Sequence, residues 1–198
     1  HDTKKAIFDC LDKKDIAFIN LDDKYISTNK LSCKSFTYSL NKKANYTAIF
    51  KKKKNESILS INNMELKIPN DLKHLCNIIL PVYAILIELG IKHSYISKRL
   101  NDFTLPIGRG KKIIVNKFEI IDDSYNANPS SVLLAINRLN STNTKGKKIF
   151  IFGDMLELGK ESEVEHKKIG DSLNKTKINI VITFGKKSIH THNQIKQS

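Results

Sequence analysis

The feature that most constrains the fold is an alternation of apolar runs and helical stretches after Gly110. Apolar, strand-like runs occur at Phe118–Ile121, Lys148–Phe152 and Ile178–Phe184. One helix between them has Asn128 as its N-cap and Pro129 at its first position, and another spans about Glu161–Leu173. Repeated strand, loop and helix units predict an α/β fold with a parallel, doubly wound sheet. Ligands of such sheets bind at the carboxyl ends of the strands, so functional residues are expected in the loops that follow these three strands.

The chain before Gly110 is strand-rich and then helical. A short helix near Lys4 is followed by strand candidates at Ile16–Asn20, Ser35–Leu40, Tyr46–Phe50, Ser57–Ile61 and Met64–Ile68. From Asp71 to Leu89, apolar residues recur at spacings of three and four, which predicts a helix that ends at Gly90. Pro81 lies inside this helix and predicts a kink. A second helix is expected at Ser94–Leu100.

The net charge of +14 raises the question of a nucleic-acid partner. Lysine is abundant along the whole chain, however, and the one dense cluster, Lys51–Lys54, lies between two strand candidates, as in a solvated hairpin. We therefore expect no specific nucleic-acid binding.

Membrane insertion and disulfide bonding are not expected either. The most apolar stretch, Asn77–Leu89, contains Pro81 and Glu88 and is too short to cross a bilayer. The three cysteines are widely spaced and form no CxxC motif, which favours a reducing, cytoplasmic setting: Cys10, Cys33 and Cys76.

The loop after Ile121 carries the densest set of polar groups, Asp122-Asp123-Ser124-Tyr125-Asn126-Ala127-Asn128-Pro129. Two adjacent carboxylates at a strand end can accept hydrogen bonds from sugar hydroxyls or hold a metal ion. The start of the next helix directs backbone N–H groups toward an anion. A capped turn with exposed aspartates explains the same residues, and the residues alone leave both interpretations open.

This string resembles the segment that opens the C-terminal domain of MurF-type Mur ligases. A second string, Gly153-Asp154-Met155-Leu156-Glu157-Leu158-Gly159, followed by Glu161, Ser162, His166 and Gly170, is similar to the family's GDMxELG…ES…H…G signature. Shorter agreements extend the resemblance from end to end: Lys4, Asn20-Leu21-Asp22-Asp23, His74 and Gly108-Arg109.

The resemblance implies both a domain organisation and an activity. Residues 1–111 would be the C-terminal part of a central ATP-binding domain, and residues 112–198 a truncated, Rossmann-like C-terminal domain. The enzyme would use ATP and Mg²⁺ to join D-alanyl-D-alanine to UDP-N-acetylmuramoyl-tripeptide through an acyl phosphate, as a cytoplasmic monomer. The alternatives are another Mur-type ligase, similar to MurE or to folylpolyglutamate synthase, and a non-catalytic basic binding remnant.

Roles for individual residues follow from the same resemblance. Lys4, if carbamylated, would be an anionic ligand that orients Mg²⁺, although a surface lysine fits the same position. Arg109 would contact ATP near its phosphates, and Asp122 or Asp123 would hold the ribose. The other residues expected at the nucleotide site are Tyr125, Asn126, Asn128 and His74. Asp154, Glu157 and His166 are expected to face the substrate cleft, with capping or surface roles as the alternative for the last two.

The sequence departs from the family pattern in three places. Four residues after His74, where the family has an asparagine that contacts adenine, this chain has Ile78. No GxxxxGK[ST] phosphate loop occurs, and the basic segment expected near the end of the C-terminal domain is missing. Together with the start at His1, these departures lead us to expect a fragment that is truncated on both sides and inactive alone.

Overall fold

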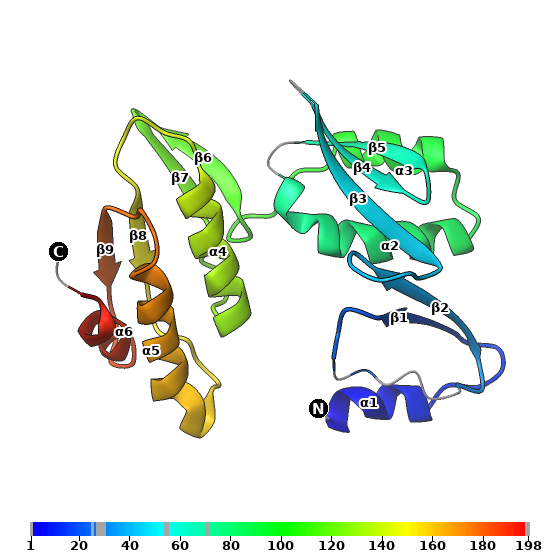
Figure 1. Ribbon diagram of the computed structural model, residues 1–198, viewed down its shortest axis with the longest axis horizontal. Coiled ribbons are helices and arrows are strands. Elements are labelled where there is room, and N and C mark those ends of the chain that lie inside the picture. The colour runs from blue at the N-terminus through cyan, green and yellow to red at the C-terminus, as the bar shows by residue number, and fades with distance from the viewer. Residues whose placement is uncertain (1, 25, 27–30, 54–55, 70–71, 197–198) are drawn as a thin grey trace. The chain divides into compact units, whose positions relative to one another are not determined.

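The computed structural model describes residues 2–24, 26, 31–53, 56–69 and 72–196, with only the backbone described at residues 2–5, 53 and 56 (Figure 1). The chain is an α/β protein that divides into two compact units, His1–Thr104 and Leu105–Ser198. Residues 105–111, assigned above to the first region, are tied to the second unit by backbone hydrogen bonds. Gly110 N donates to Asp122 O at 2.7 Å, and Gly108 O accepts from Tyr125 N at 3.0 Å.

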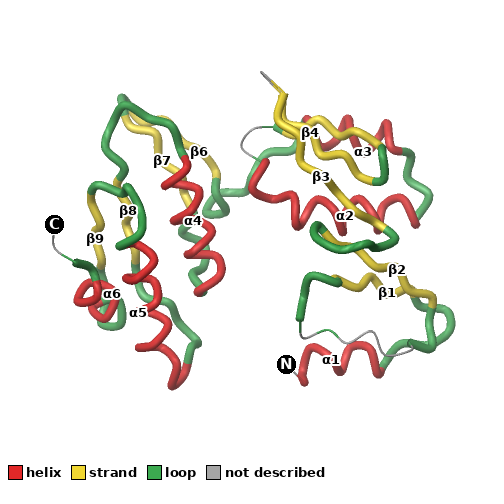
Figure 2. Tube along the Cα trace, viewed as in Figure 1, coloured by secondary structure: helices red, strands yellow, loops and turns green. Residues whose placement is uncertain are grey.

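The first unit is built on a mixed sheet with the strand order β1-β2-β3-β4-β5 (Figure 2). Strands β1, β2 and β3 are parallel, and β4 and β5 continue the sheet in antiparallel fashion. The five strands are Ile16–Asn20, Lys34–Ser39, Tyr46–Lys53, Glu56–Ile61 and Met64–Ile68, close to the predicted runs. The hairpin predicted around the lysine cluster is confirmed as β3–β4, but Lys51–Lys53 belong to the strand itself and Lys54 lies outside the described residues.

Helices α1 (Asp2–Asp9), η1 (Lys73–Leu75), α2 (Cys76–Glu88) and α3 (His93–Asn101) complete this unit. α2 packs against β3, and α3 packs against β5. The apolar residues at three-and-four spacing, which include Ile78 and Val82, do not mark the core face of α2. The helix buries Leu80, Tyr83 and Ala84, whereas Ile78 and Val82 are about half exposed. Because α2 is apolar almost all round, a three-and-four spacing can be drawn on more than one of its faces.

Gly90 ends α2 as predicted. Its φ of +81° is in the left-handed region that favours glycine. Gly90 N donates to Ile87 O and Ile91 N donates to Leu86 O, both at 2.9 Å. This pair of bonds is the Schellman arrangement, and it satisfies two carbonyls at the helix end.

The second unit contains a hairpin followed by a strand–helix–strand unit (Figure 1). β6 (Lys111–Val115) and β7 (Phe118–Asp122) are antiparallel, and α4 (Pro129–Ser141) follows them. β8 (Ile149–Phe152) and β9 (Ile180–Thr183) are parallel and are joined through η2 (Gly159–Glu161) and α5 (Ser162–Leu173), while α6 (Ile189–Gln194) lies after β9.

The expectation that all three predicted strands of this region form one parallel sheet is wrong for the first of them. In the described residues β7 pairs with β6, a strand that the sequence analysis did not identify, and it does so in antiparallel register from Val115↔Phe118 to Lys111↔Asp122. The intervening Asn116 has φ +52°, and asparagine tolerates the left-handed conformation that tight hairpin turns need.

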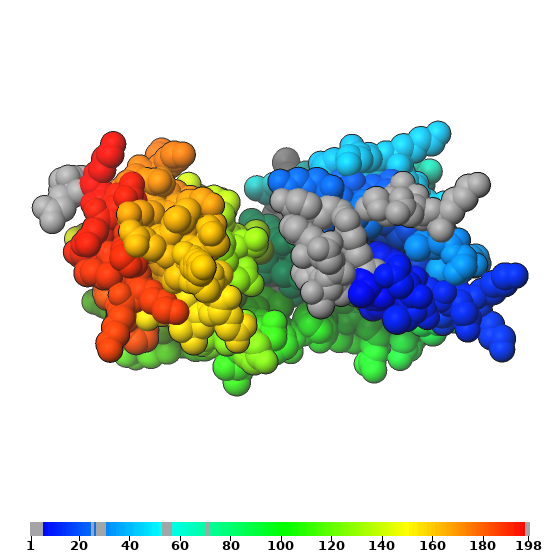
Figure 3. Space-filling view, turned by 90° about the horizontal axis from the view of Figure 1, so that it is seen from below, coloured from blue at the N-terminus to red at the C-terminus, as the bar shows by residue number. Residues whose placement is uncertain are grey.

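The core of the second unit lies between α4, α5 and one face of the β8–β9 pair. α4 and α5 run side by side (Figure 1) and contribute Val132, Ile136, Ile169 and Leu173, which meet Phe152 and Met155. α5 and α6 also lie against each other, as Figure 3 shows in yellow-orange and red. Gly170 permits this approach, because a Cβ at that position would come within 2.6 Å of Gln194 Cβ.

None of the described helices combines the length and the apolar character that a membrane-spanning helix requires.

Candidate functional site

The loops that carry the two family-like strings, residues 122–129 and 153–159, are called the signature loops here. They lie at the same end of the second unit. Near the end of α4, Asn140 Oδ1 accepts from Lys177 N at 2.9 Å and Asn140 O accepts from Lys148 Nζ. Lys148 and Lys177 precede β8 and β9, so α4 runs antiparallel to these strands and begins at their carboxyl edge. The 153–158 loop leaves β8 at that edge, and Ala127 packs against the core cluster that contains Met155. The two loops therefore lie at the same edge, although β7 does not share the parallel sheet.

Asp122 is engaged by local donors. Its Oδ1 accepts from Ser124 N at 3.1 Å and from Ser124 Oγ at 2.6 Å, and its Oδ2 accepts from Gly108 N at 3.1 Å. The hydrogen bonds from Ser124, with a smaller contribution from Gly108, lower the pKa of Asp122. Both oxygens of the carboxylate thus hold the polypeptide in place.

Arg109 and Tyr125 come together beside Asp122. The guanidinium carbon of Arg109 lies 3.9 Å from the centroid of the Tyr125 ring, and both residues are exposed. Gly108 makes this contact possible. It has φ +77°, and a Cβ there would be 3.0 Å from both Cβ and N of Tyr125. The structure therefore presents a stacked cation and aromatic ring at the surface, a combination that suits an anionic, ring-containing ligand.

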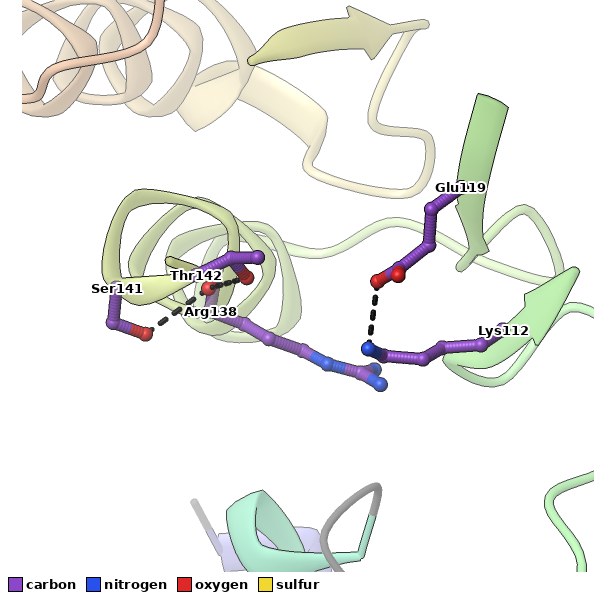
Figure 4. A network of polar contacts seen from close by, with 5 residues as sticks. All are labelled: Lys112, Glu119, Arg138, Ser141 and Thr142. Atoms are coloured by element: carbon purple, nitrogen blue, oxygen red, sulfur yellow. Dashed lines mark hydrogen bonds and ion pairs between the residues drawn. The ribbon is translucent and has the colours of Figure 1, made fainter. Parts of the chain in front are cut away.

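Asp123 is exposed, unlike its neighbour. Partial desolvation by nearby protein atoms raises the pKa of Asp123, the charge of Arg138 opposes that rise, and Asp122 adds to it. Figure 4 shows Arg138 on α4 extending toward the hairpin, where Lys112 Nζ and Glu119 Oε1 are 2.6 Å apart. Asp123 is the more exposed residue of the two adjacent aspartates, and its carboxylate lies near the charge of Arg138.

The two asparagines of the loop have structural roles at the start of α4. Asn126 Oδ1 accepts from Ala127 N at 2.8 Å. Asn128 is the N-cap as predicted, since its Oδ1 accepts from Ser131 N at 2.9 Å and its own N–H donates to Ser131 Oγ at 3.1 Å. This reciprocal pair is a capping box, which fixes the direction of the helix start.

Asp154 fastens the loop after β8 to the loop after β9. Its Oδ1 accepts from Lys187 N at 2.9 Å and from Ser188 N at 2.7 Å. Burial raises the pKa of Asp154, but the hydrogen bonds from Ser188 and Lys187 outweigh burial, so the net effect is to lower it. Gly185, with φ +114°, lies directly against this carboxylate, and a Cβ there would overlap it. Asp154 therefore joins two strand ends instead of projecting from one.

Glu157 does project from the same loop. Its side chain is exposed, and its φ of +60° is uncommon for a residue other than glycine. Left-handed backbone in a non-glycine residue is often found at functional sites. An exposed position is compatible both with contact to a ligand and with the surface role left open above.

His166 is in the core and does not face a cleft, which corrects the prediction. It has no exposed surface. Its Nε2 accepts from Met155 N at 3.1 Å, and Nδ1 lies 2.7 Å from Ser162 O. Because a backbone N–H can only donate and a carbonyl can only accept, the proton must be on Nδ1. The ring connects the 153–159 loop to α5, so His166 supports this loop from within the core.

The remaining predicted residues belong to the first unit. Lys4 lies in α1, but its side chain is outside the described residues. His74 is in η1 and partly buried. In the Asn20–Asp23 turn, Asp22 accepts from Ser39 Oγ at 2.6 Å and from Leu40 N at 2.7 Å. Over the part of the chain that the structure describes, no three or more His, Cys, Asp or Glu side chains are grouped as metal ligands.

The residues that hold the two loops together were not predicted from the sequence. Ser124, Gly110 and the backbone of Lys187 and Ser188 were not singled out, although all of them bond to the signature aspartates. One signal was present. An Asp followed two residues later by Ser, as at Asp122 and Ser124, is typical of a turn closed by the aspartate side chain.

The chain is similar in sequence to a known family of proteins. Residues 108–197 match the family model described as Mur ligase, glutamate ligase domain. The chain is 35% identical over 194 residues to the UDP-N-acetylmuramoyl-tripeptide–D-alanyl-D-alanine ligase of Buchnera aphidicola, covering 93% of this chain and 42% of that protein. It is 32% identical over 179 residues to the corresponding ligase of Rickettsia prowazekii, covering 85% and 40%. The chain thus spans less than half the length of these relatives.

Solved structures show the same fold. The MurF structure from Acinetobacter baumannii superposes with a TM-score of 0.83 at 21% identity, covering 98% of this chain and 44% of that one. A MurF ligase from Thermotoga maritima in complex with ADP gives a TM-score of 0.75 at 21% identity, covering 96% and 45%.

Proposed function

We propose that this chain, which belongs to the Mur ligase family, is part of an ATP-dependent ligase that adds D-alanyl-D-alanine to UDP-N-acetylmuramoyl-tripeptide in peptidoglycan precursor synthesis. The observation that carries the proposal is the 35% identity to such a ligase along 93% of the chain. The cytoplasm, where such precursors and ATP occur, is the proposed location. MurE-like and folylpolyglutamate synthase-like activities are less favoured, because the relatives reported above are named as D-alanyl-D-alanine ligases.

The reaction forms one amide bond at the expense of ATP. The terminal carboxylate of the tripeptide attacks the γ-phosphorus of ATP, giving an acyl phosphate and ADP. The amine of the dipeptide then attacks the acyl carbon, and the tetrahedral intermediate expels inorganic phosphate as the nitrogen loses its proton. Such chemistry depends mainly on positioning the reactants and neutralising charge.

The chemistry of the second unit's loops suits a nucleotide. Arg109 supplies a permanent cation for phosphate oxygens, and Asp123 supplies an exposed acceptor for ribose hydroxyls. Tyr125 offers an aromatic surface, and Asn126 and Asn128 shape the loop that carries it. His74 is proposed to contact ATP. A MurF ligase with this fold has been solved in complex with ADP, as described above.

Two further roles are proposed. Lys4, as a carbamate, would supply an anionic oxygen to Mg²⁺, which prefers oxygen ligands and would be repelled by an ammonium group. Glu157 is proposed to contact the substrate through its projecting carboxylate.

The activity is tested in the intact protein that contains this chain. Phosphate release should require ATP, UDP-N-acetylmuramoyl-tripeptide and D-alanyl-D-alanine together. Release that does not depend on the dipeptide would overturn the proposed reaction. The 198-residue chain alone should release no phosphate above background, because its sequence has no phosphate loop to hold the β- and γ-phosphates.

The role of Lys4 is tested with its neighbour as the matched control. Lys4→Ala should abolish most activity, and bicarbonate with a short carboxylic acid should restore part of it. Lys5→Ala should keep most of the activity. Equal, near-normal turnover of the two variants would mean that Lys4 is a surface lysine.

A further inference from the structure

Two segments that are separate in the sequence form one hydrogen-bonded unit beside the proposed nucleotide site. The turn Gly108–Gly110 and the loop Asp122–Tyr125 are joined by three bonds. Gly108 N donates to Asp122 Oδ2 at 3.1 Å, Gly110 N donates to Asp122 O at 2.7 Å, and Tyr125 N donates to Gly108 O at 3.0 Å. Arg109 is therefore presented by a turn that the 122–125 loop holds at three points.

We propose that Asp122 is a positioning residue that holds Arg109 over the ring of Tyr125, and that it is not itself a ligand of the nucleotide. The inference rests on the nucleotide site proposed above. Oδ2 of Asp122 is used by Gly108, and Oδ1 accepts two hydrogen bonds from Ser124. A carboxylate has room for about four such bonds, so three local donors leave it little capacity for a ribose.

The position of Arg109 depends on this carboxylate. Gly108 is buried, and Asp122 is the acceptor for its N–H, so without the carboxylate that donor would be left unsatisfied and the turn would rearrange. A rearranged turn should move Arg109 away from its place 3.9 Å from the Tyr125 centroid.

Stacking on Tyr125 prepares Arg109 for an anion. When one face of the guanidinium lies over an aromatic ring, the N–H groups at its edge remain available to two oxygens of one phosphate. The pairing also restricts a long, exposed side chain before the ligand arrives, which reduces the ordering required on binding. Asp122 thus acts on the ligand through Arg109.

The pairing can be observed directly in the 198-residue chain by NMR of arginine side chains. The sequence has three arginines, so their Nε–Hε signals are few. Ring current from Tyr125 should shift the Arg109 signal, and Tyr125→Leu, which removes the ring, identifies that shift. Arg99 provides an internal reference, because its guanidinium carbon is 5.7 Å from the Tyr95 centroid in the other unit.

Three variants decide the proposal. Asp122→Ala should move the Arg109 signal to its position in Tyr125→Leu and leave the Arg99 signal unchanged. Asp122→Asn should move it part of the way, because its amide group can accept at one end but places N–H groups against a backbone donor at the other. Asp123→Ala, the matched control at the adjacent carboxylate, should leave the Arg109 shift unchanged. An Arg109 shift that persists in Asp122→Ala overturns the proposal.

A titration with ADP separates this proposal from the nucleotide site itself. If both hold, ADP should perturb the Arg109 and Tyr125 signals, and Asp122→Ala should weaken ADP binding by about 2-fold to about 5-fold, the loss expected for one exposed cation–π contact. Asp123→Ala should weaken binding without displacing Arg109. The ADP titration is made on the intact protein that contains this chain, because the 198-residue sequence has no phosphate loop. If ADP perturbs neither residue in the unsubstituted intact protein, the nucleotide role of this loop fails, while the arginine signals of the 198-residue chain still decide whether Asp122 positions Arg109.

Discussion

Replacement of His166 by alanine should be among the most damaging single changes in the second unit. The imidazole is completely buried, its Nε2 accepts from Met155 N at 3.1 Å, and its Nδ1 donates to Ser162 O over 2.7 Å. The ring also lies 5.9 Å from the Phe152 ring, centroid to centroid, at the centre of the core. The substitution therefore removes two hydrogen bonds and leaves a cavity.

The magnitude follows from these contacts. Two lost hydrogen bonds cost about 1 kcal/mol each, and the backbone groups left without partners bring the cost toward the upper end. A cavity of ring size adds about 1–2 kcal/mol. The free energy of unfolding of the second unit should thus fall by about 3–4 kcal/mol. His190→Ala is the matched control. That side chain is 35% exposed, and its Nδ1 is 3.9 Å from Glu163 Oε1, so its loss should cost under about 0.5 kcal/mol.

Hydrogen exchange suits this measurement, because the chain has two units and a single unfolding curve would mix them. The amide of Met155 and the amides of α5 should lose protection in His166→Ala and keep it in His190→Ala. Long-range ¹H–¹⁵N correlation should place the proton of His166 on Nδ1. A proton on Nε2, or equal protection in the two variants, would refute the reasoning.

Three other changes test the loops. Gly108→Ala should destabilise the second unit by about 1–3 kcal/mol in a urea titration, because alanine is strained at φ +77° and its Cβ would press on Tyr125. Gly146→Ala is the control and should be nearly neutral, because Gly146 has φ outside the positive range and its nearest neighbour is Thr144 Oγ1 at 3.6 Å. Asp154→Asn should lower the free energy of unfolding at neutral pH by about 1–2 kcal/mol. The folded-state pKa of Asp154 is below its ordinary value of 3.8, so the stabilisation is present above pH 3.8 and is lost as pH falls below it. The variant should therefore lose less stability than the parent between pH 4 and pH 2. Glu157→Gly should raise stability or leave it unchanged, because glycine relieves the left-handed strain at φ +60°. The same substitution should lower the ligase activity of the intact protein. A clear loss of stability would show that Glu157 is held by contacts and is not strained.

Local signals were sufficient for much of the fold. The alternation of strands and helices after Gly110 identified the βαβ unit, and Gly90 and Asn128 marked helix ends because capping depends on a few neighbouring residues. The strand β6 was missed because Lys111-Lys112 opens it and only three apolar residues follow, a run too short to separate from a loop by pattern. Without β6, β7 had no visible antiparallel partner and was assigned to the parallel sheet.

The side chains at the site were harder to assign, because their roles depend on contacts distant in sequence. His166 meets a backbone amide eleven residues away, and Asp154 meets donors more than thirty residues away. Neither contact leaves a periodic pattern. Periodicity also failed on α2, where apolar residues surround the helix and burial of Tyr83 is decided by the sheet that it meets.

Each signature loop contains one acidic residue that holds the loop and one that projects from it. Asp122 and Asp154 bond to backbone N–H groups of other segments, at Gly108 in one case and at Lys187 and Ser188 in the other. Asp123 and Glu157 stay exposed in the same loops. Asp122 accepts three hydrogen bonds and Asp154 accepts two from backbone N–H groups, so each carboxylate has fewer lone pairs left for a ligand. Substitution of the holding residues should therefore change the geometry of the site and the stability of the unit together. Substitution of the projecting residues should change binding more than stability, because an exposed carboxylate contributes little to the fold.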